Sequence, residues 1–151
     1  IFIPAFVGLS SPHWLPTCKG MIYGLTPSVN KNHIIRSALE SIAFQIKDYF
    51  DDLEKNQKIV CNDLYIDGGI VSNTSFMQFL ANTLKRKIYV TNFKDMSSYG
   101  SLVMGILGMK IKKNLKDISI YKQKYSAYLP NKNKFPDSYK EWKEVLKNFY
   151  L

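Results

Sequence analysis

Strand and helix patterns alternate between residues 63 and 109, and this order constrains the fold more than any other feature. Compact apolar segments at 63–67 and 88–91 have the character of short strands. Each is followed by a segment with apolar residues at three- and four-residue steps, which predicts a helix after each strand, the second from about Ser97 to Met109. Strand, helix, strand and helix in this order predict an α/β fold with right-handed crossover connections.

A helix of about 25 residues is the clearest single element, and we expect it to begin after Asn30 or Asn32 and to end at Glu54–Asn56. Either asparagine can cap it, because the side-chain oxygen accepts a bond from a first-turn N–H. Arg36 and Glu40 are four residues apart and can pair across one turn. The apolar residues recur at helical spacing and predict one buried stripe: Ile35, Leu39, Ile42, Ile46, Tyr49 (or Phe50) and Leu53.

The remaining segments contain weaker patterns. Residues 1–6 and 20–25 are apolar and bounded by turn residues, which predicts two more strands. Residues 110–129 are polar and poorly periodic, and we predict no regular element there. A last amphipathic helix is predicted from Tyr139, Trp142, Val145, Leu146 and Phe149.

Composition indicates one ordinary domain. The chain has 151 residues, of which 46% are apolar, enough for a sizeable core. Cys18 and Cys61 form neither a disulfide framework nor a metal motif, so we expect a reducing, cytoplasmic location. No apolar run approaches the length that spans a membrane. Because the chain starts at Ile1 and its first residues resemble the inside of a strand, we expect it to be part of a longer protein.

The net charge of +9 is concentrated near the C-terminus, where residues 110–151 contribute +7 and residues 1–109 only +2. A basic segment of this kind can bind nucleic acid or an anionic membrane surface. The simpler interpretation is a lysine-rich, solvated surface. Arg36 and Arg86 are the only arginines, and specific base recognition favours arginine, so we expect no nucleic-acid partner.

The turn at residues 67–73, with the sequence Asp-Gly-Gly-Ile-Val-Ser-Asn, is the most informative stretch. Gly68 and Gly69 permit positive φ angles and leave the backbone open to a ligand. The helix that follows presents free N–H groups, which suit an anion or a polar edge of a nucleotide. Ser72 or Asn73 can cap this helix, and the amide of Asn73 can both donate to and accept from an adenine ring. Plain turn and capping chemistry explains the same residues without a ligand.

Two other features have structural interpretations that we favour. Ser101, Gly105 and Gly108 fall near one helical face, which predicts close packing of that helix against the sheet. Alternatively, the start of the helix near Ser97 points toward a nucleotide. Asp67 ends a strand, and there a capping or turn role is favoured over that of a base.

We assign no catalytic residue and no metal site in this sequence. His13 and His33 have no acidic or cysteine partner at useful spacing, so both are interpreted as structural. No Ser/His/Asp or Cys/His set can be assembled.

These residues resemble the FGGY family of carbohydrate kinases. The second signature of that family is matched by Gly20–Leu25, a seven-residue spacer and His33–Glu40. Within the family the chain is most similar to the glycerol kinase branch. Three stretches carry that similarity: FIPAFVGLSSPHW, GLTPSVNKNHIIRSALESIAFQ and DGGIVSNTSFMQFLANTL.

The resemblance implies an actin-like, ribonuclease H-like ATPase fold, in which helices flank a mixed sheet. It implies that residues 1–129 form the C-terminal domain of a two-domain kinase and that residues 130–151 form a helix packed on the same domain. Gly69 and Asn73, with Gly68 beside them, would contact the adenosine of ATP.

The implied reaction is the ATP-dependent phosphorylation of glycerol to glycerol 3-phosphate. The catalytic base, the glycerol contacts, the phosphate loops and most of the Mg²⁺ site would belong to the missing N-terminal portion. We therefore expect this segment to be inactive alone, and the whole enzyme to be a homodimer or higher oligomer.

Several positions differ from the usual family pattern. His13 and Leu15 replace a tyrosine and an acid, Lys19 replaces an arginine, and Asp95 replaces a glutamate. Two alternatives stay open: another sugar kinase of the family, of xylulose or ribulose type, and a basic, non-enzymatic binding module.

Overall fold

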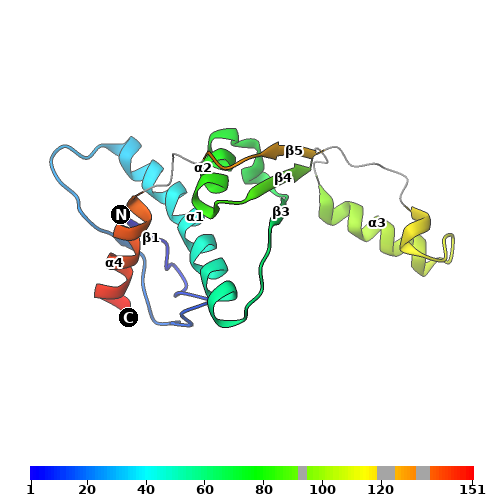
Figure 1. Ribbon diagram of the computed structural model, residues 1–151, viewed down its shortest axis with the longest axis horizontal. Helices are drawn as coiled ribbons and strands as arrows, with labels where there is room; N and C mark the ends of the chain where they lie inside the picture. Colours follow the sequence, from blue (N-terminus) through cyan, green and yellow to red (C-terminus); the bar gives the residue numbers. More distant parts are fainter. Residues whose placement is uncertain (92–94, 119–124, 132–136) are drawn as a thin grey trace.

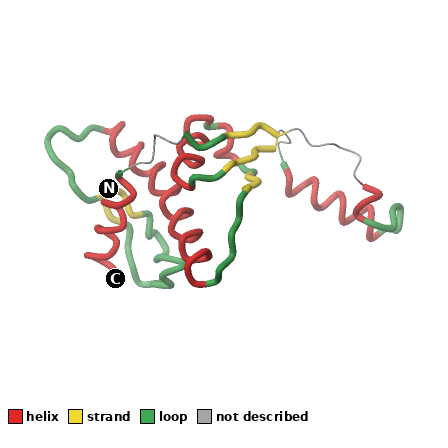
Figure 2. The backbone as a smooth tube through the Cα atoms, in the orientation of Figure 1, coloured by secondary structure: helices red, strands yellow, loops and turns green. Residues whose placement is uncertain are grey.

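The computed structural model describes residues 1–91, 95–118, 125–131 and 137–151 and shows an α/β arrangement (Figures 1 and 2). Its helices are α1 (Lys31–Asn56), α2 (Thr74–Leu84), α3 (Met96–Gly108) and α4 (Ser138–Tyr150), with short 3₁₀ turns η1 (Gly69–Ser72) and η2 (Leu115–Ile118). Its strands are β1 (Phe2–Ile3), β2 (Met21–Ile22), β3 (Asp63–Ile66), β4 (Lys87–Thr91) and β5 (Tyr125–Tyr128). The predicted α/β fold class is confirmed.

The main sheet is mixed and has the strand order β3-β4-β5. β3 and β4 run parallel, with Leu64 opposite Ile88, and β5 is antiparallel to β4, with Tyr128 also opposite Ile88. β5 lies in the polar segment for which we predicted no regular element, and that prediction was wrong. Its four residues form a strand because they pair with the free edge of β4, and no pattern within 110–129 announces that partner.

The N-terminal strands are shorter than predicted. β1 and β2 form an antiparallel pair in which Phe2 lies opposite Ile22 and Ile3 opposite Met21. Pro4 follows β1 directly and has no N–H to donate, so it ends the regular pairing.

α1 lies at the centre of the molecule (Figure 1). Its N-cap is Asn30 rather than Asn32. The Asn30 side-chain oxygen accepts from the backbone N–H groups of Asn32 at 2.9 Å and His33 at 3.3 Å. In return, the backbone N–H of Asn30 donates to Nδ1 of His33 at 3.2 Å. This reciprocal arrangement confirms the structural interpretation of His33. The predicted pair between Arg36 and Glu40 is present, at 2.7 Å.

The single apolar stripe predicted for α1 is wrong, because the helix is buried on two faces. Ala43 belongs to a core shared with α2 and the sheet, and Phe44 belongs to a second core shared with the N-terminal segment and α4. Ile35 and Ile42, which the stripe included, are exposed. A helix between two layers needs apolar residues on both sides, so one stripe at helical spacing does not describe it.

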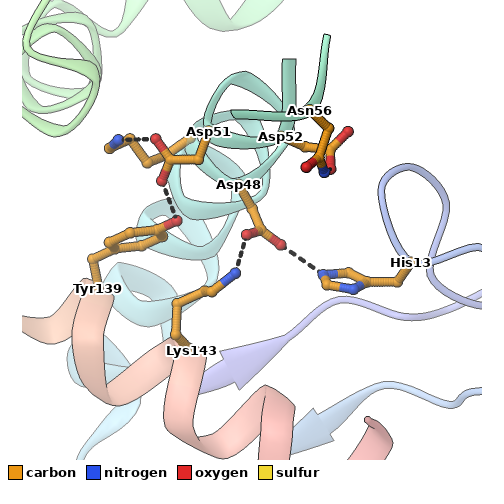
Figure 3. A network of polar contacts seen from close by, with 8 residues as sticks. His13, Asp48, Asp51, Asp52, Asn56, Tyr139 and Lys143 are labelled. Carbon is orange, nitrogen blue, oxygen red and sulfur yellow. Dashed lines mark hydrogen bonds and ion pairs between the residues drawn. The ribbon is translucent and has the colours of Figure 1, made fainter. Parts of the chain in front are cut away.

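A buried carboxylate on α1 ties three segments together (Figure 3). Asp48 is only 3% exposed; one of its oxygens lies 2.6 Å from Nε2 of His13, and the other pairs with the Lys143 ammonium on α4. His13 therefore has an acidic partner that lies 35 residues away in sequence, too far for a spacing pattern to identify, and the contact agrees with the structural interpretation of His13.

α4 is held by a second set of contacts. Nε1 of Trp142 donates to the carbonyl of Phe2 at 3.1 Å, and the Tyr139 hydroxyl donates to Asp51 at 2.9 Å (Figure 3). Burial, together with the Asp51 carboxylate, raises the pKa of the Tyr139 hydroxyl well above its ordinary value. Of the predicted apolar residues of α4, only Phe149 is exposed.

α3 extends away from the rest of the molecule (Figure 1). None of its residues is buried, and apart from adjacent residues and the backbone of the helix itself, no described atom lies within 4 Å of where a Cβ would stand on Gly105 or Gly108. The predicted packing of this helix against the sheet is therefore absent among the described residues. No described helix is long and apolar enough to cross a membrane.

Candidate functional site

The glycine turn lies at the end of β3, where the sequence predicted it. Gly68 has a φ of 109° and a ψ of 176°, a conformation that a residue with a Cβ rarely adopts. The chain then forms the turn η1 before α2 begins, with Val71 N donating to Gly68 O at 3.2 Å and Asn73 N to Ile70 O at 3.0 Å. The 3₁₀ turn η1 therefore stands between the strand and the helix.

Both glycines are open to the surroundings. No described atom outside their immediate neighbours lies within 4 Å of where a Cβ would stand on Gly68 or Gly69. Just beyond them, Ile70 and Val71 pack on the core that α2 and the sheet share. The turn thus joins an accessible backbone corner to a half-buried pair of apolar side chains, and such a corner can hold a ligand against main-chain atoms.

Asn73, not Ser72, is the N-cap of α2. Its Oδ1 accepts from the backbone N–H of Phe76 at 3.0 Å, so the oxygen is already used by the helix. The side-chain nitrogen has no hydrogen-bond partner within the part of the chain that the structure describes. Asn73 therefore leaves two N–H donors for a ligand, while its oxygen already accepts from the helix.

A pocket of about 290 Å³ adjoins Asn73. It lies between the N-terminal halves of α1 and α2 and is largely apolar, with one cation and one carboxylate in its lining. Its lining residues are Arg36, Leu39, Glu40, Asn73, Ser75, Phe76 and Phe79. A mostly apolar pocket with a few polar groups is typical of a small-molecule site.

The start of α3 lies beside Asp67, the residue that precedes the glycine turn. Asp95 caps this helix by accepting from the backbone N–H and the hydroxyl of Ser98, at 2.9 and 2.6 Å. These hydrogen bonds, the hydroxyl first, hold the pKa of the Asp95 carboxyl below its ordinary value. Oδ2 of Asp67 accepts from the N–H of Met96, the first residue of α3, at 3.3 Å. Asp67 is therefore a capping residue, as predicted, but it caps a helix 29 residues further along the chain.

A second pocket, of about 210 Å³, adjoins Asp67 at the carboxyl ends of the parallel strands β3 and β4. In open α/β sheets, ligands bind at this end of the strands. Its lining residues are Tyr65, Ile66, Asp67, Thr91, Met96 and Tyr125. Sequence reasoning did not link Asp67 to Met96, and no local pattern could, because tertiary structure alone brings them together.

A third pocket, of about 340 Å³, lies beside His13 and Asp48, far from the glycine turn in the sequence. Both Asp48 oxygens are already paired, with His13 and Lys143, so this cluster is better explained by structural anchoring than by ligand chemistry. Within the described ranges, no group of three or more His, Cys, Asp or Glu side chains could hold a metal ion.

Comparison with known proteins places this geometry in a family. Residues 1–109 match the model of the C-terminal domain of the FGGY family of carbohydrate kinases. A glycerol kinase from Saccharolobus islandicus (strain L.S.2.15 / Lassen #1) is 33% identical over 148 residues, which cover 97% of this chain and 30% of that relative. The chain thus spans about a third or less of the curated relatives it matches.

Solved structures show the same relationship. The chain superposes on Plasmodium falciparum glycerol kinase, crystallised with ADP, with a TM-score of 0.79 and 32% identity, covering 100% of this chain and 31% of that one. A ligand-bound xylulose kinase from Lactobacillus acidophilus gives a TM-score of 0.74 at 22% identity, covering 99% and 32%. This second likeness concerns the fold alone.

Proposed function

Because this chain belongs to the FGGY family of carbohydrate kinases, we propose that it is the C-terminal part of a glycerol kinase and supplies the adenosine-binding half of its ATP site. The whole protein would transfer the γ-phosphate of ATP to a terminal hydroxyl of glycerol and release glycerol 3-phosphate. Transfer of this kind depends mainly on positioning and charge stabilisation. The role of this part is therefore to fix the nucleotide.

The observation that carries the proposal is the open glycine corner next to Asn73. Gly68 and Gly69 expose backbone, and the side-chain nitrogen of Asn73 is directed away from the bond that caps α2. The pocket between α1 and α2 adjoins the same residue. These groups suit the sugar and base of a nucleoside, and a related glycerol kinase was crystallised with ADP. Gly68, Gly69 and Asn73 are accordingly our proposed nucleotide-binding residues.

The rest of the machinery is assigned to the part of the protein outside these 151 residues. We propose that the base, the glycerol contacts and most ligands of Mg²⁺ lie there; among the described residues no group of three or more His, Cys, Asp or Glu side chains could hold the metal ion. We also propose that residues 1–129 belong to one domain and that α4 packs on it. Cytoplasmic location, a homo-oligomeric enzyme and inactivity of this segment alone stay predictions.

Substrate choice favours glycerol over a larger sugar. The glycerol kinases match at 33% identity or a similar level over nearly the whole chain, whereas the xylulose kinase structure matches at 22%. A screen of glycerol, xylulose and ribulose with the full-length enzyme decides between these alternatives. A basic, non-enzymatic module is the weaker alternative, and it requires salt-sensitive binding to nucleic acid or anionic lipid.

The test is the Asn73→Ala substitution in the full-length enzyme. Loss of one donor to the nucleoside is expected to raise the KM for ATP roughly tenfold while leaving the KM for glycerol within about twofold. Asn73→Ser is the matched variant, because serine still caps the helix but lacks the amide nitrogen. Both variants should lose ATP affinity, and only the alanine variant should lose stability. An unchanged KM for ATP in both would refute the assignment.

A further inference from the structure

We infer that Asp67 is a positioning residue for the nucleotide: its carboxylate fastens the start of the glycine turn to the start of α3 and thereby sets the ATP affinity of the site. This inference rests on the proposed function. It concerns a residue that touches neither the nucleoside nor the reacting atoms but acts through the backbone of Gly68 and Gly69.

The hydrogen bonds within the glycine turn come from residues that follow it. Gly68 and Gly69 have no described atom beyond their immediate neighbours where a Cβ would stand, and glycine carries the largest backbone freedom of any residue. Their carbonyls accept from Val71 N at 3.2 Å and from the Ser72 hydroxyl at 3.0 Å, so these bonds restrain the turn on its far side. On the far side, Ile70 and Val71 pack on the core and Asn73 is fixed to the first turn of α2.

On the near side, the side-chain restraint that the structure shows is Asp67. Its Oδ2 accepts from the N–H of Met96 at 3.3 Å. That N–H belongs to the first turn of α3, where a helix has no internal acceptor to offer. A carboxylate at such a position is stabilised by the positive end of the helix. Asp67 thus joins the last residue before Gly68 to an element that begins 29 residues later.

Contacts at the start of α3 join this helix to the sheet. No residue of α3 is buried, and Met96 contacts both the Asp67 carboxylate and the Thr91 hydroxyl at the end of β4. The Asp67 carboxylate is thus one of the contacts that orient α3 relative to the sheet. The pocket beside Asp67 is lined by both Asp67 and Met96 and lies at the carboxyl ends of β3 and β4. Losing the bond would free the turn on one side and the helix on the other, and the binding-competent turn would be populated less often.

The experiment compares Asp67→Ala with Asp67→Asn in the full-length kinase. Removing the acceptor is expected to raise the KM and the equilibrium Kd for ATP roughly fivefold, with kcat and the KM for glycerol within about twofold. The asparagine variant keeps an acceptor of the same length, so its ATP affinity should stay close to that of the parent. Amide exchange at Met96 should accelerate in the alanine variant only.

Asp63→Ala is the matched control, because it removes the same side chain from the other end of β3; it should leave ATP affinity unchanged. The inference is overturned if Asp67→Ala leaves ATP affinity intact, or if Asp67→Asn is as impaired as the alanine variant. Failure of this inference alone leaves Asn73→Ala impaired in ATP binding. If Asn73→Ala also binds ATP normally, the proposed function itself fails.

Discussion

α2 and α3 have similar sequence features but differ in how much of each helix is buried. Each follows a strand of the parallel pair, each is rich in apolar residues, and each has a side-chain cap, Asn73 or Asp95. α2 buries six of its 11 residues between α1 and the sheet. α3, with 13 residues, buries none.

The difference shows that apolar composition predicts that a helix needs a packing partner but does not identify that partner. α2 finds cover because α1 and β4 lie next to it within this chain. The exposed side chains of Leu102 and Met104 on α3 have no such neighbour among the described residues. The two helices thus differ in burial: α2 belongs to an apolar core, whereas the apolar side chains of α3 are exposed. The chain spans only 30% of its relatives.

The strongest way to break this comparison is to remove one leucine from each helix. Leu80→Ala on α2, at a position 1% exposed, should lower the free energy of unfolding of the 151-residue chain by about 4 kcal/mol through lost burial and a cavity. Leu102→Ala on α3, at a position 59% exposed, should change it by less than about 0.5 kcal/mol. Urea unfolding followed by circular dichroism measures both. Equal losses would show that α3 packs against the body in solution.

A second experiment asks whether polar anchors hold the body together as the apolar core does. Asp48→Ala should cost about 2 kcal/mol, because it leaves His13 and Lys143 without the buried carboxylate between them. This is less than the roughly 3–5 kcal/mol expected for a fully buried pair, because the Lys143 side chain is 43% exposed and can turn toward water. Glu40→Ala breaks a surface pair with Arg36 and should cost about 0.5 kcal/mol or less. Similar costs for the two variants would contradict the anchoring role of Asp48.

The helix caps sharpen the comparison further. Asn73→Ala should cost about 1 kcal/mol of global stability, because α2 unfolds together with the core. Asp95→Ala removes an equivalent cap from α3, and its effect should be confined to faster amide exchange in the first turn of that helix. A shift in the global unfolding midpoint with Asp95→Ala would mean that α3 and the core unfold as one unit.

The smallest expected effect is a pH dependence confined to α3. Because the pKa of Asp95 is lowered in the folded chain, its stabilising bonds to Ser98 are fully present above the ordinary aspartate pKa of about 4. They are lost as the pH falls through the lowered value. The protection factors of the α3 amides, which correct for the pH dependence of intrinsic exchange, should fall below that point when followed from pH 6 downward. Asp95→Asn, which caps without titrating, should abolish the dependence.

Much of the secondary structure was predictable, because its signals are local. The caps Asn30 and Asn73 act within four residues, so the starts of α1 and α2 follow from short motifs. The ends of β3 and β4 and the extent of α4 lie within a few residues of their predicted positions. β5 was missed because its stability comes from β4, and η1 was missed because the glycine pair permits several paths into α2.

The candidate site divides in the same way. The glycine pair and Asn73 were identified from the sequence, and the structure places them together at the end of β3. The sequence allowed Asn73 to be either a helix cap or a ligand contact. It did not show that Oδ1 would be used by the cap. The pairing of His13 with Asp48 and that of Asp67 with Met96 could not be predicted, since 35 and 29 residues separate the partners.

The sequence by itself determined the four α-helices and most of the strands, where the helices begin, and where the backbone must turn on glycine. These features depend on interactions across a few residues, which can form whatever the rest of the chain does. Tertiary structure alone decided that α1 is buried on two faces and that β5 joins β4. It also decided that α3 has no cover within the described chain, because burial depends on which distant surface is available to pack against.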